Sequence, residues 1–191
     1  MAILRKSELI SKYNLKQSNL VSELGEKYYS SIKLHESSEQ FSVLSRYDIF
    51  LSHSYNDARI IKLIKEMLEE KGYSVYVDWI VDNNLNRRNV TSTSASLIRN
   101  RMNCCASLLY ITSESAEKSV WMPWELGYMD AKTGRVAVAP ILDEEVDFDG
   151  REYLGLYPYL DLTNESFYIH KNISEWVNFS GWMKGENPIL H

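Results

Sequence analysis

Long apolar runs are missing from this 191-residue sequence, and their absence excludes a membrane-spanning helix. Such a helix needs about 20 consecutive apolar residues, and no stretch approaches that length. The start of the chain does not read as a signal peptide, because Arg5 and Lys6 interrupt the apolar residues before a hydrophobic core of the required length develops. We therefore expect a soluble, cytoplasmic protein.

Cysteine, histidine and clustered positive charge are also scarce. The two cysteines, Cys104 and Cys105, are adjacent and poorly placed to bridge each other, so we expect two buried free thiols. The four histidines lack metal-ligand spacing, so we expect no metal site. The formal net charge is -5, and the pair Arg87-Arg88 is too small to form a nucleic-acid groove. These shortages argue against disulfide scaffolds, metal centres and nucleic-acid binders.

Two common catalytic motifs are absent as well. No glycine-rich loop of either nucleotide-binding type occurs, and no serine lies in a G-x-S-x-G elbow. A serine hydrolase therefore has little support. The balance of 45% hydrophobic and 25% charged residues is that of an ordinary globular domain.

What the sequence does contain falls into two regions. In the first, apolar residues recur every four positions, which predicts an amphipathic helix; these residues are Leu20, Leu24, Tyr28 and Ile32. A shorter helix is predicted near residues 4–13. We expect a helical N-terminal extension over residues 1–45, and a second domain over residues 46–191.

From residue 47 on, short apolar runs alternate with helical patterns. The runs predict strands at residues 47–51, 73–77, 106–111, 136–142 and 159–162. Helices are predicted between residues 57 and 72, around residues 95–105, over 124–131 and over 173–182. The first helix has a clear polar face that includes Lys65, and Gly72 stands where a left-handed residue would end it.

This alternation indicates an α/β fold with a parallel sheet covered on both faces, in an open, doubly wound arrangement. Ligands of such sheets bind beyond the carboxyl ends of the strands. The polar and aromatic residues at those ends should therefore share one edge; they are Ser52, His53, Ser54, Asp78, Trp79, Thr112 and Ser113.

The most unusual segment runs from Ser119 to Gly127 and places Glu125 directly after the second of two tryptophans, Trp121 and Trp124. If a helix begins near Pro123, Glu125 lies in its first turn, where the helix dipole favours the ionised carboxylate. Two interpretations remain open at this point. Glu125 is either a reactive carboxylate with aromatic walls, or a helix-capping residue beside two core tryptophans.

Two segments resemble the TIR (Toll/interleukin-1 receptor) domain family. Residues 46–54 with Asn56 and Asp57 look like the opening strand and loop, and Trp121-x-x-Trp124-Glu125-Leu126-Gly127 is similar to the catalytic helix of bacterial TIR proteins that consume NAD. The motifs occur in the right order, and the resemblance covers about residues 46–162. It implies a flavodoxin-like, five-stranded parallel sheet.

The resemblance also implies roles for individual residues. Glu125 would be the catalytic carboxylate, with Trp121 and Trp124 as aromatic walls. The loop of Phe50, Ser52, His53 and Ser54 would approach the nicotinamide ribose, and Asp78-Trp79 would open a loop over the substrate that also mediates assembly. That loop, residues 78–88, lacks the glycine and proline often found in the family.

The implied reaction is cleavage of the nicotinamide–ribose bond of NAD+, which is substrate and not cofactor. Nicotinamide leaves as a neutral amine, so the barrier lies in positive charge on the ribose, which a carboxylate stabilises. The product is ADP-ribose, a cyclic isomer or a conjugate. Stand-alone bacterial TIR proteins of anti-phage systems such as Thoeris make a signal of this kind for a separate effector protein, and self-association on activation is expected.

Two other functions remain as alternatives. A TIR domain can be a non-catalytic scaffold that only recruits partners. A nucleoside 2-deoxyribosyltransferase has a related fold and also places a carboxylate at a glycosidic carbon. Glu125 with its tryptophans favours the enzyme over the scaffold, and the loop after the first strand argues against the transferase.

Overall fold

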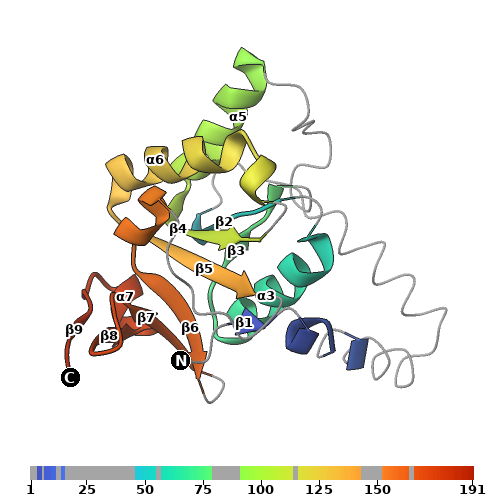
Figure 1. Ribbon diagram of the computed structural model, residues 1–191. Helices are drawn as coiled ribbons and strands as arrows, with labels where there is room; N and C mark the ends of the chain where they lie inside the picture. The colour runs from blue at the N-terminus through green and yellow to red at the C-terminus, as the bar shows by residue number, and fades with distance from the viewer. Residues whose placement is uncertain are drawn as a thin grey trace.

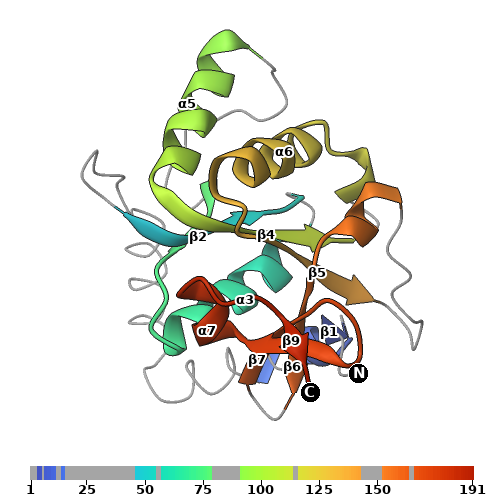
Figure 2. The same ribbon diagram turned by 90° about the vertical axis from the view of Figure 1, so that its left-hand side faces the viewer.

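A central parallel sheet with helices on both faces forms the body of the protein (Figures 1 and 2). The structure is a computed structural model and describes residues 4–5, 7–11, 14–15, 46–54, 57–78, 91–113, 116–142, 152–163 and 166–191. Within these residues no helix is long and apolar enough to span a membrane.

Five parallel strands make up the part of the sheet that the sequence predicts. They are β2 (Tyr47–Ser52), β3 (Val75–Tyr76), β4 (Cys105–Thr112), β5 (Val136–Leu142) and β6 (Tyr159–Thr163). Their order is β3-β2-β4-β5-β6, and each neighbouring pair is parallel. This is the doubly wound order of flavodoxin-like folds, so the predicted fold class is confirmed.

Alternate side chains of the strands pack into two separate hydrophobic cores, one on each face of the sheet. On one face Leu51 and Leu109 pack with helices α3 (Ala58–Glu70) and α7 (Phe179–Met183). On the other face Phe50 and Leu108 pack with α5 (Ser92–Asn103) and α6 (Trp121–Thr133). Figure 2 shows the two helical layers on either side of the sheet. Burial on both faces explains why the strands read as nearly continuous apolar runs.

Helix α3 largely follows its predicted pattern. Asp57 is the N-terminal cap residue, and Gly72 has a positive φ of 88° directly after the helix, as expected. Lys65 was predicted on the exposed face, and this is wrong, because Lys65 is only 7% exposed. Its Nζ lies 2.7 Å from Glu69 Oε1. A long aliphatic stem lets a lysine lie buried while its amine keeps a charged partner.

The last part of the chain extends the sheet with antiparallel strands instead of forming the predicted helix. The strands are β7 (Ser166–His170), β8 (Glu175–Asn178) and β9 (Ile189–Leu190). The helix predicted over residues 173–182 is therefore wrong in its first part, which contains β8, and right only at its end, where α7 begins. The side chain of Asn172 accepts bonds from the backbone N–H groups of Ser174 and Glu175, which forms a turn and starts β8. Asn178 then caps α7 by accepting from Gly181 N at 2.7 Å.

The first residues of the chain join the sheet. Strand β1 (Leu4–Arg5) pairs in parallel with β5, residues 7–11 and 14–15 are helical, and Leu9 is 3% exposed within the α3-side core. The short helix predicted near residues 4–13 is therefore only partly right, because its start is a strand. The helix predicted around Leu20–Ile32 lies outside the described residues, and the domain boundary after residue 45 stays a prediction.

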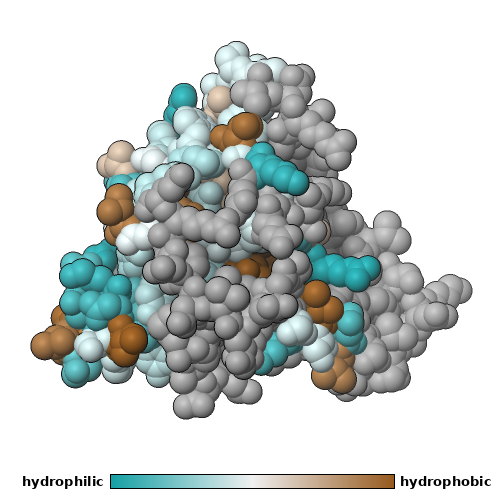
Figure 3. All heavy atoms as spheres, viewed as in Figure 1, coloured by the Kyte–Doolittle hydropathy of each residue, from teal (hydrophilic) through white to brown (hydrophobic). Residues whose placement is uncertain are grey.

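Exposed apolar side chains gather on the C-terminal hairpin. Ile173, Ile189 and Leu190 are 61–82% exposed, and Figure 3 shows brown spheres in the region of β8 and β9. Two short 3-10 helices complete the described part, η2 (Ala116–Lys118) and η3 (Glu152–Leu156). The second of them leads into β6 beside the candidate site.

Candidate functional site

The site is built on the carboxyl end of β2, under helix α6. Ser52 is the last residue of β2 and stands opposite Tyr110 of β4 in the sheet register. The two side chains therefore point to the same face of the sheet, the one that α6 covers. Neighbouring parallel strands share this alternation, so the register alone decides which polar groups meet the helix.

Glu125 of α6 meets Ser52 at this edge. Ser52 Oγ donates a hydrogen bond of 2.6 Å to Glu125 Oε2, and both residues are fully buried, at 0% exposure. A hydroxyl donor at this distance makes a strong bond to a carboxylate and fixes its orientation. The two residues are 73 positions apart in the chain, so the tertiary fold brings them together.

The position of Glu125 in its helix differs from the prediction. Helix α6 begins at Trp121, not near Pro123, and its first turn holds no acidic residue. Ser119 Oγ accepts a bond from Met122 N at 3.3 Å, which stabilises this earlier start. Glu125 thus lies in the second turn, where the helix dipole acts less on it, and its carboxylate accepts the hydrogen bond from Ser52.

The two tryptophans contact each other but face different surroundings. Their rings are 5.6 Å apart at an interplanar angle of 68°. Trp121, at 6% exposure, lies one helical turn before Glu125 and so shares its face of α6. Trp124 is half-buried, stacks on Tyr128 at 6.0 Å and lies beneath the guanidinium of Arg99 at 5.7 Å. The structure therefore brings Trp121 toward Glu125 and places Trp124 between α6 and α5.

His53 and Asp78 form a second buried pair at the same edge. His53 Nε2 is 3.5 Å from Asp78 Oδ1, and the side chains are 2% and 4% exposed. His53 Nδ1 is 2.8 Å from the carbonyl oxygen of Leu51. A solvated loop histidine is the usual expectation from sequence, and the structure shows a buried one between the Leu51 carbonyl and Asp78.

The remaining predicted loop residues take varied positions. Phe50 is 1% exposed and stacks on Tyr76 at 5.2 Å and 24°, so it belongs to the core behind the site. Ser54 is half-buried, and its carbonyl accepts from Asp57 N at 3.1 Å. Trp79 lies outside the described residues.

The far side of this edge is also held by side chains. Ser113 Oγ, just after β4, donates to Asp57 Oδ2 at 2.5 Å and accepts from Ala116 N at 3.1 Å. This bond links the end of β4 to the start of α3. The prediction that the residues after β2, β3 and β4 share one edge agrees with the sheet order and with these contacts.

Tyr110 belongs to the site, although the sequence analysis did not predict it as a site residue. Burial, and then the neighbouring phenol of Tyr153, to which it is hydrogen-bonded, raise the pKa of Tyr110, and the charge of Glu125 adds to this. Tyr110 is 4% exposed, whereas Tyr153, in η3, is 40% exposed. Tyr110 could have been predicted from its position opposite Ser52 in the neighbouring strand. That position is known only once the register of β2 and β4 is known.

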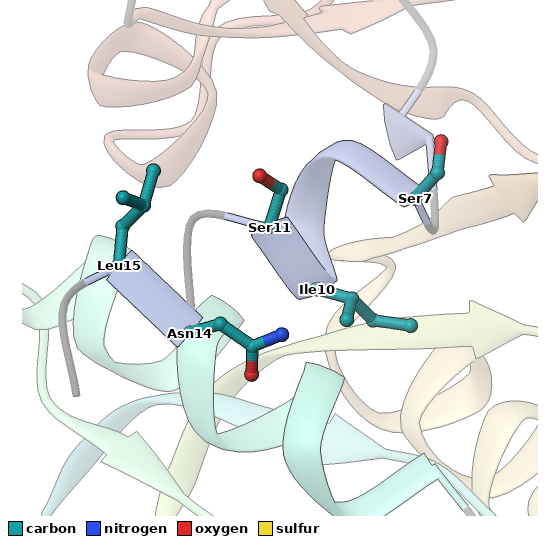
Figure 4. A pocket seen from close by; sticks show the side chains of 5 residues that line it. All are labelled: Ser7, Ile10, Ser11, Asn14 and Leu15. Carbon is teal, nitrogen blue, oxygen red and sulfur yellow. The ribbon is translucent and has the colours of Figure 1, made fainter. Parts of the chain in front are cut away.

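No group of three or more metal-ligating side chains lies together in the part of the chain that the structure describes. A surface hollow is lined by Ser7, Ile10, Ser11, Asn14 and Leu15 (Figure 4). All five come from the N-terminal segment, and none carries a charge or an aromatic ring. This hollow is therefore separate from the site around Glu125.

Comparison with known proteins adds two kinds of finding. A family model of the TIR domain matches residues 49–176. The chain is 46% identical over 146 residues to a protein of Bacillus cereus (strain MSX-D12) named "Probable 3' cyclic ADP-D-ribose synthase ThsB'". The aligned region covers 72% of this chain and 76% of that protein. The chain is 26% identical over 124 residues to the "Putative cyclic ADP-D-ribose synthase TIR2" of Cytobacillus dafuensis, which covers 63% of this chain and only 33% of that protein.

Proposed function

The chain belongs to the TIR domain family, and we propose that it cleaves the nicotinamide–ribose bond of NAD+ and closes the rest of the molecule into a cyclic ADP-ribose. The observation that carries this proposal is the buried contact between Ser52 and Glu125 at the ligand-binding edge of the sheet. The names of two relatives support cyclisation as the outcome. The product would serve as a signal in anti-phage defence.

Glu125 would act first through its charge. When the bond between ribose C1′ and the nicotinamide nitrogen breaks, the electron pair leaves with neutral nicotinamide, and positive charge develops on the ribose. A carboxylate beside that sugar stabilises the charge, and it does so strongly in a site that excludes water. The Ser52 hydroxyl, which donates to Glu125 Oε2, would orient the carboxylate for this step.

Capture of the ribose follows within the same molecule. An adenine nitrogen or a ribose hydroxyl attacks C1′ and forms the new bond. A hydroxyl nucleophile loses its proton in this step, and Glu125 would accept it. The overall change is NAD+ to cyclic ADP-ribose, nicotinamide and one proton.

The aromatic residues would shape the pocket. Trp121 shares the helix face of Glu125 and offers a ring on which a flat base can stack. Trp124 would support Trp121 through their edge contact, and Phe50 would support the wall from the core. His53, Ser54, Asp78 and Trp79 were assigned substrate contacts by resemblance, and these assignments stay predictions.

Substrate access requires movement around Glu125. Because the residue has no exposed surface, NAD+ reaches it only after neighbouring side chains shift. Self-association of TIR domains is one event that could drive this shift, and we propose that it accompanies activation in the cytoplasm. A separate effector protein would then read the cyclic product.

The decisive experiment compares purified wild type with Glu125→Gln in the presence of NAD+, at high protein concentration, by mass-resolved chromatography. Glu125→Gln keeps the shape of the side chain and removes its charge. Asp130→Asn is the matched control, because Asp130 is another carboxylate of α6 but bonds to Tyr157 at 2.9 Å. We expect nicotinamide and a cyclic product from wild type and from Asp130→Asn, and neither from Glu125→Gln.

The same experiment separates the alternatives. Linear ADP-ribose alone would establish hydrolysis without cyclisation. Cleavage of deoxynucleosides and not of NAD+ would indicate the transferase. NAD+ that stays intact in every assembly state tested, and in lysate from phage-infected cells, would leave only the scaffold.

A further inference from the structure

Tyr153 connects the buried site around Glu125 to the surface of the protein. Glu125 and its partner Ser52 are 0% exposed. Tyr110, which stands opposite Ser52 in the register of β2 and β4, is 4% exposed. The phenol of Tyr110 is hydrogen-bonded to that of Tyr153, and Tyr153 is 40% exposed. The series Ser52, Tyr110, Tyr153 therefore leads from the buried carboxylate to an aromatic ring that a ligand can reach.

Contacts with α6 and with the sheet hold η3, the element that carries Tyr153, in place. Directly after η3, the hydroxyl of Tyr157 donates to Asp130 Oδ2 of α6 at 2.9 Å, and its ring packs against the hydrophobic cluster on the α6 side of the sheet. The carbonyl oxygen of Pro158 accepts from Val138 N of β5 at 2.9 Å. Tyr153 is thus presented from a supported segment, and a binding group on such a segment loses less freedom when a ligand binds.

Cyclisation requires both halves of NAD+ to be held in one site. After the bond between C1′ and nicotinamide breaks, C1′ is captured by the adenosine half of the same molecule or by water. The first route gives cyclic ADP-ribose and the second adds a water molecule and gives linear ADP-ribose; each releases one proton. Capture within the molecule becomes efficient when its nucleophile is held beside C1′. A surface that binds the adenine near Glu125 therefore favours the cyclic product.

Two aromatic rings of the site suit the two bases of NAD+. Trp121 is 6% exposed and lies on the Glu125 face of α6, at the depth where nicotinamide would leave the ribose. Tyr153 lies at the surface and is linked to the same site through Tyr110. An aromatic ring stacks on the flat face of a base, and tyrosine does so at a low cost in conformational entropy because it has few rotatable bonds.

We propose that Tyr153 is a substrate-binding residue that selects the cyclic product: its ring stacks on the adenine of NAD+ and holds the adenosine half beside C1′. The proposal rests on the proposed function, because cyclisation must occur for a residue to favour it. It adds a specificity-determining residue in η3, outside the two segments that resemble the TIR family.

The first test measures binding without turnover. In the Glu125→Gln protein, calorimetry gives Kd for NAD+ and for nicotinamide mononucleotide, which lacks the adenosine half. Adding Tyr153→Ala should weaken binding of NAD+ about tenfold through lost stacking and leave Kd for nicotinamide mononucleotide within twofold. A Kd for NAD+ that does not change, or an equal weakening of both ligands, would overturn the proposal.

The second test follows the product. Mass-resolved chromatography gives the ratio of cyclic to linear ADP-ribose, which compares two outcomes of one reaction and so does not depend on the overall rate. Tyr153→Ala should lower this ratio about tenfold, and Tyr153→Phe, which keeps the ring, should restore most of it. A ratio that Tyr153→Ala leaves unchanged, or that is equally low in both variants, would refute stacking by the ring.

Leu156 offers a matched control within η3, because it is 81% exposed and has no aromatic ring. Leu156→Ala should keep both Kd values and the product ratio. A change equal to that of Tyr153→Ala would trace the effect to η3 as a whole and overturn the proposal.

The two tests also separate this proposal from the proposed function. If Tyr153→Ala weakens only NAD+ but wild type forms only linear ADP-ribose, the adenine contact stands, and cyclisation is rejected together with the role of Tyr153 in it. A Glu125→Gln protein that binds neither ligand would reject the NAD+ site itself.

Discussion

Removal of the Ser52 hydroxyl is the sharpest test of the site, because it changes one oxygen atom. Ser52→Ala deletes the donor that lies 2.6 Å from Glu125 Oε2 and leaves a buried carboxylate with one bond fewer. A hydrogen bond to a charged group contributes about 1.5–3 kcal/mol. If all of this is lost in the transition state, kcat/KM for NAD+ falls roughly 10- to 150-fold.

The control for this variant is another buried serine in a neighbouring strand. Ser107 is 1% exposed, and its Oγ donates to the carbonyl oxygen of Asp48 at 2.8 Å. Ser107→Ala therefore removes a buried hydroxyl and a bond of similar length without touching Glu125. It should cost about 1 kcal/mol of unfolding free energy and leave kcat/KM unchanged.

The assay measures nicotinamide release under initial-rate conditions, together with unfolding in urea for each variant. We expect both serine variants to lose unfolding free energy, Ser52→Ala more than Ser107→Ala, and only Ser52→Ala to lose activity. If Ser52→Ala keeps kcat/KM within twofold of wild type, Ser52 does not support the reacting form of Glu125, and the mechanism proposed for this pair is refuted.

Two further predictions follow from the structure. Trp121→Ala should raise KM for NAD+ roughly tenfold through lost base stacking, and Trp124→Ala should raise it less; an unchanged KM in Trp121→Ala would count against stacking. Burial raises the pKa of Cys105 above its ordinary 9.0, so the thiol stabilises the fold fully below that pH and loses its contribution as the pH rises above it. The difference in unfolding free energy between wild type and Cys105→Ala should therefore shrink above pH 9, by up to about 1.4 kcal/mol per pH unit. If urea titrations give the same difference at every pH, the pKa of Cys105 is not raised in the folded protein.

The sheet could be predicted from the sequence because its information is local. Strands β2, β3, β4 and β5 are buried on both faces, so β4 and β5 read as apolar runs whatever their neighbours are. Alternation of strands and helices then limits the topology to a few right-handed arrangements. The residues at the carboxyl ends of the strands follow from that topology without further evidence.

The start of α6 and the C-terminal hairpin could not be predicted in the same way. Proline is favoured at the first helical position, which pointed to Pro123, but its missing N–H is tolerated anywhere in the first turn. The Ser119 hydroxyl satisfies Met122 N and lets the helix start earlier. In the tail, Trp176 and Val177 fit a helix as well as a strand over so short a segment, and the pairing of Val177 with Ile169 settles it.

Contacts between distant positions in the chain were also beyond the sequence. His53 and Asp78 were both predicted at the sheet edge, but their pairing depends on how the ends of β2 and β3 meet. Burial of His53 follows from that pairing. The sequence around His53 does not indicate its burial, because the carboxylate beside it belongs to Asp78, which is 25 residues away in the chain.

The later position of Glu125 in α6 changes which groups can bond to its carboxylate, and this raises the importance of Ser52. In a first turn, the unpaired N–H groups and the helix dipole would stabilise a carboxylate whatever the sheet presents. In the second turn the backbone N–H groups are already bonded within the helix, and a buried carboxylate depends on side chains that reach it. The register that aligns Ser52 with Tyr110 on the α6 face supplies such a donor. The reactivity of Glu125 is therefore a property of the end of β2 as much as of its own helix, and for this reason removal of one hydroxyl from β2 should affect the reaction as well as the stability of the fold.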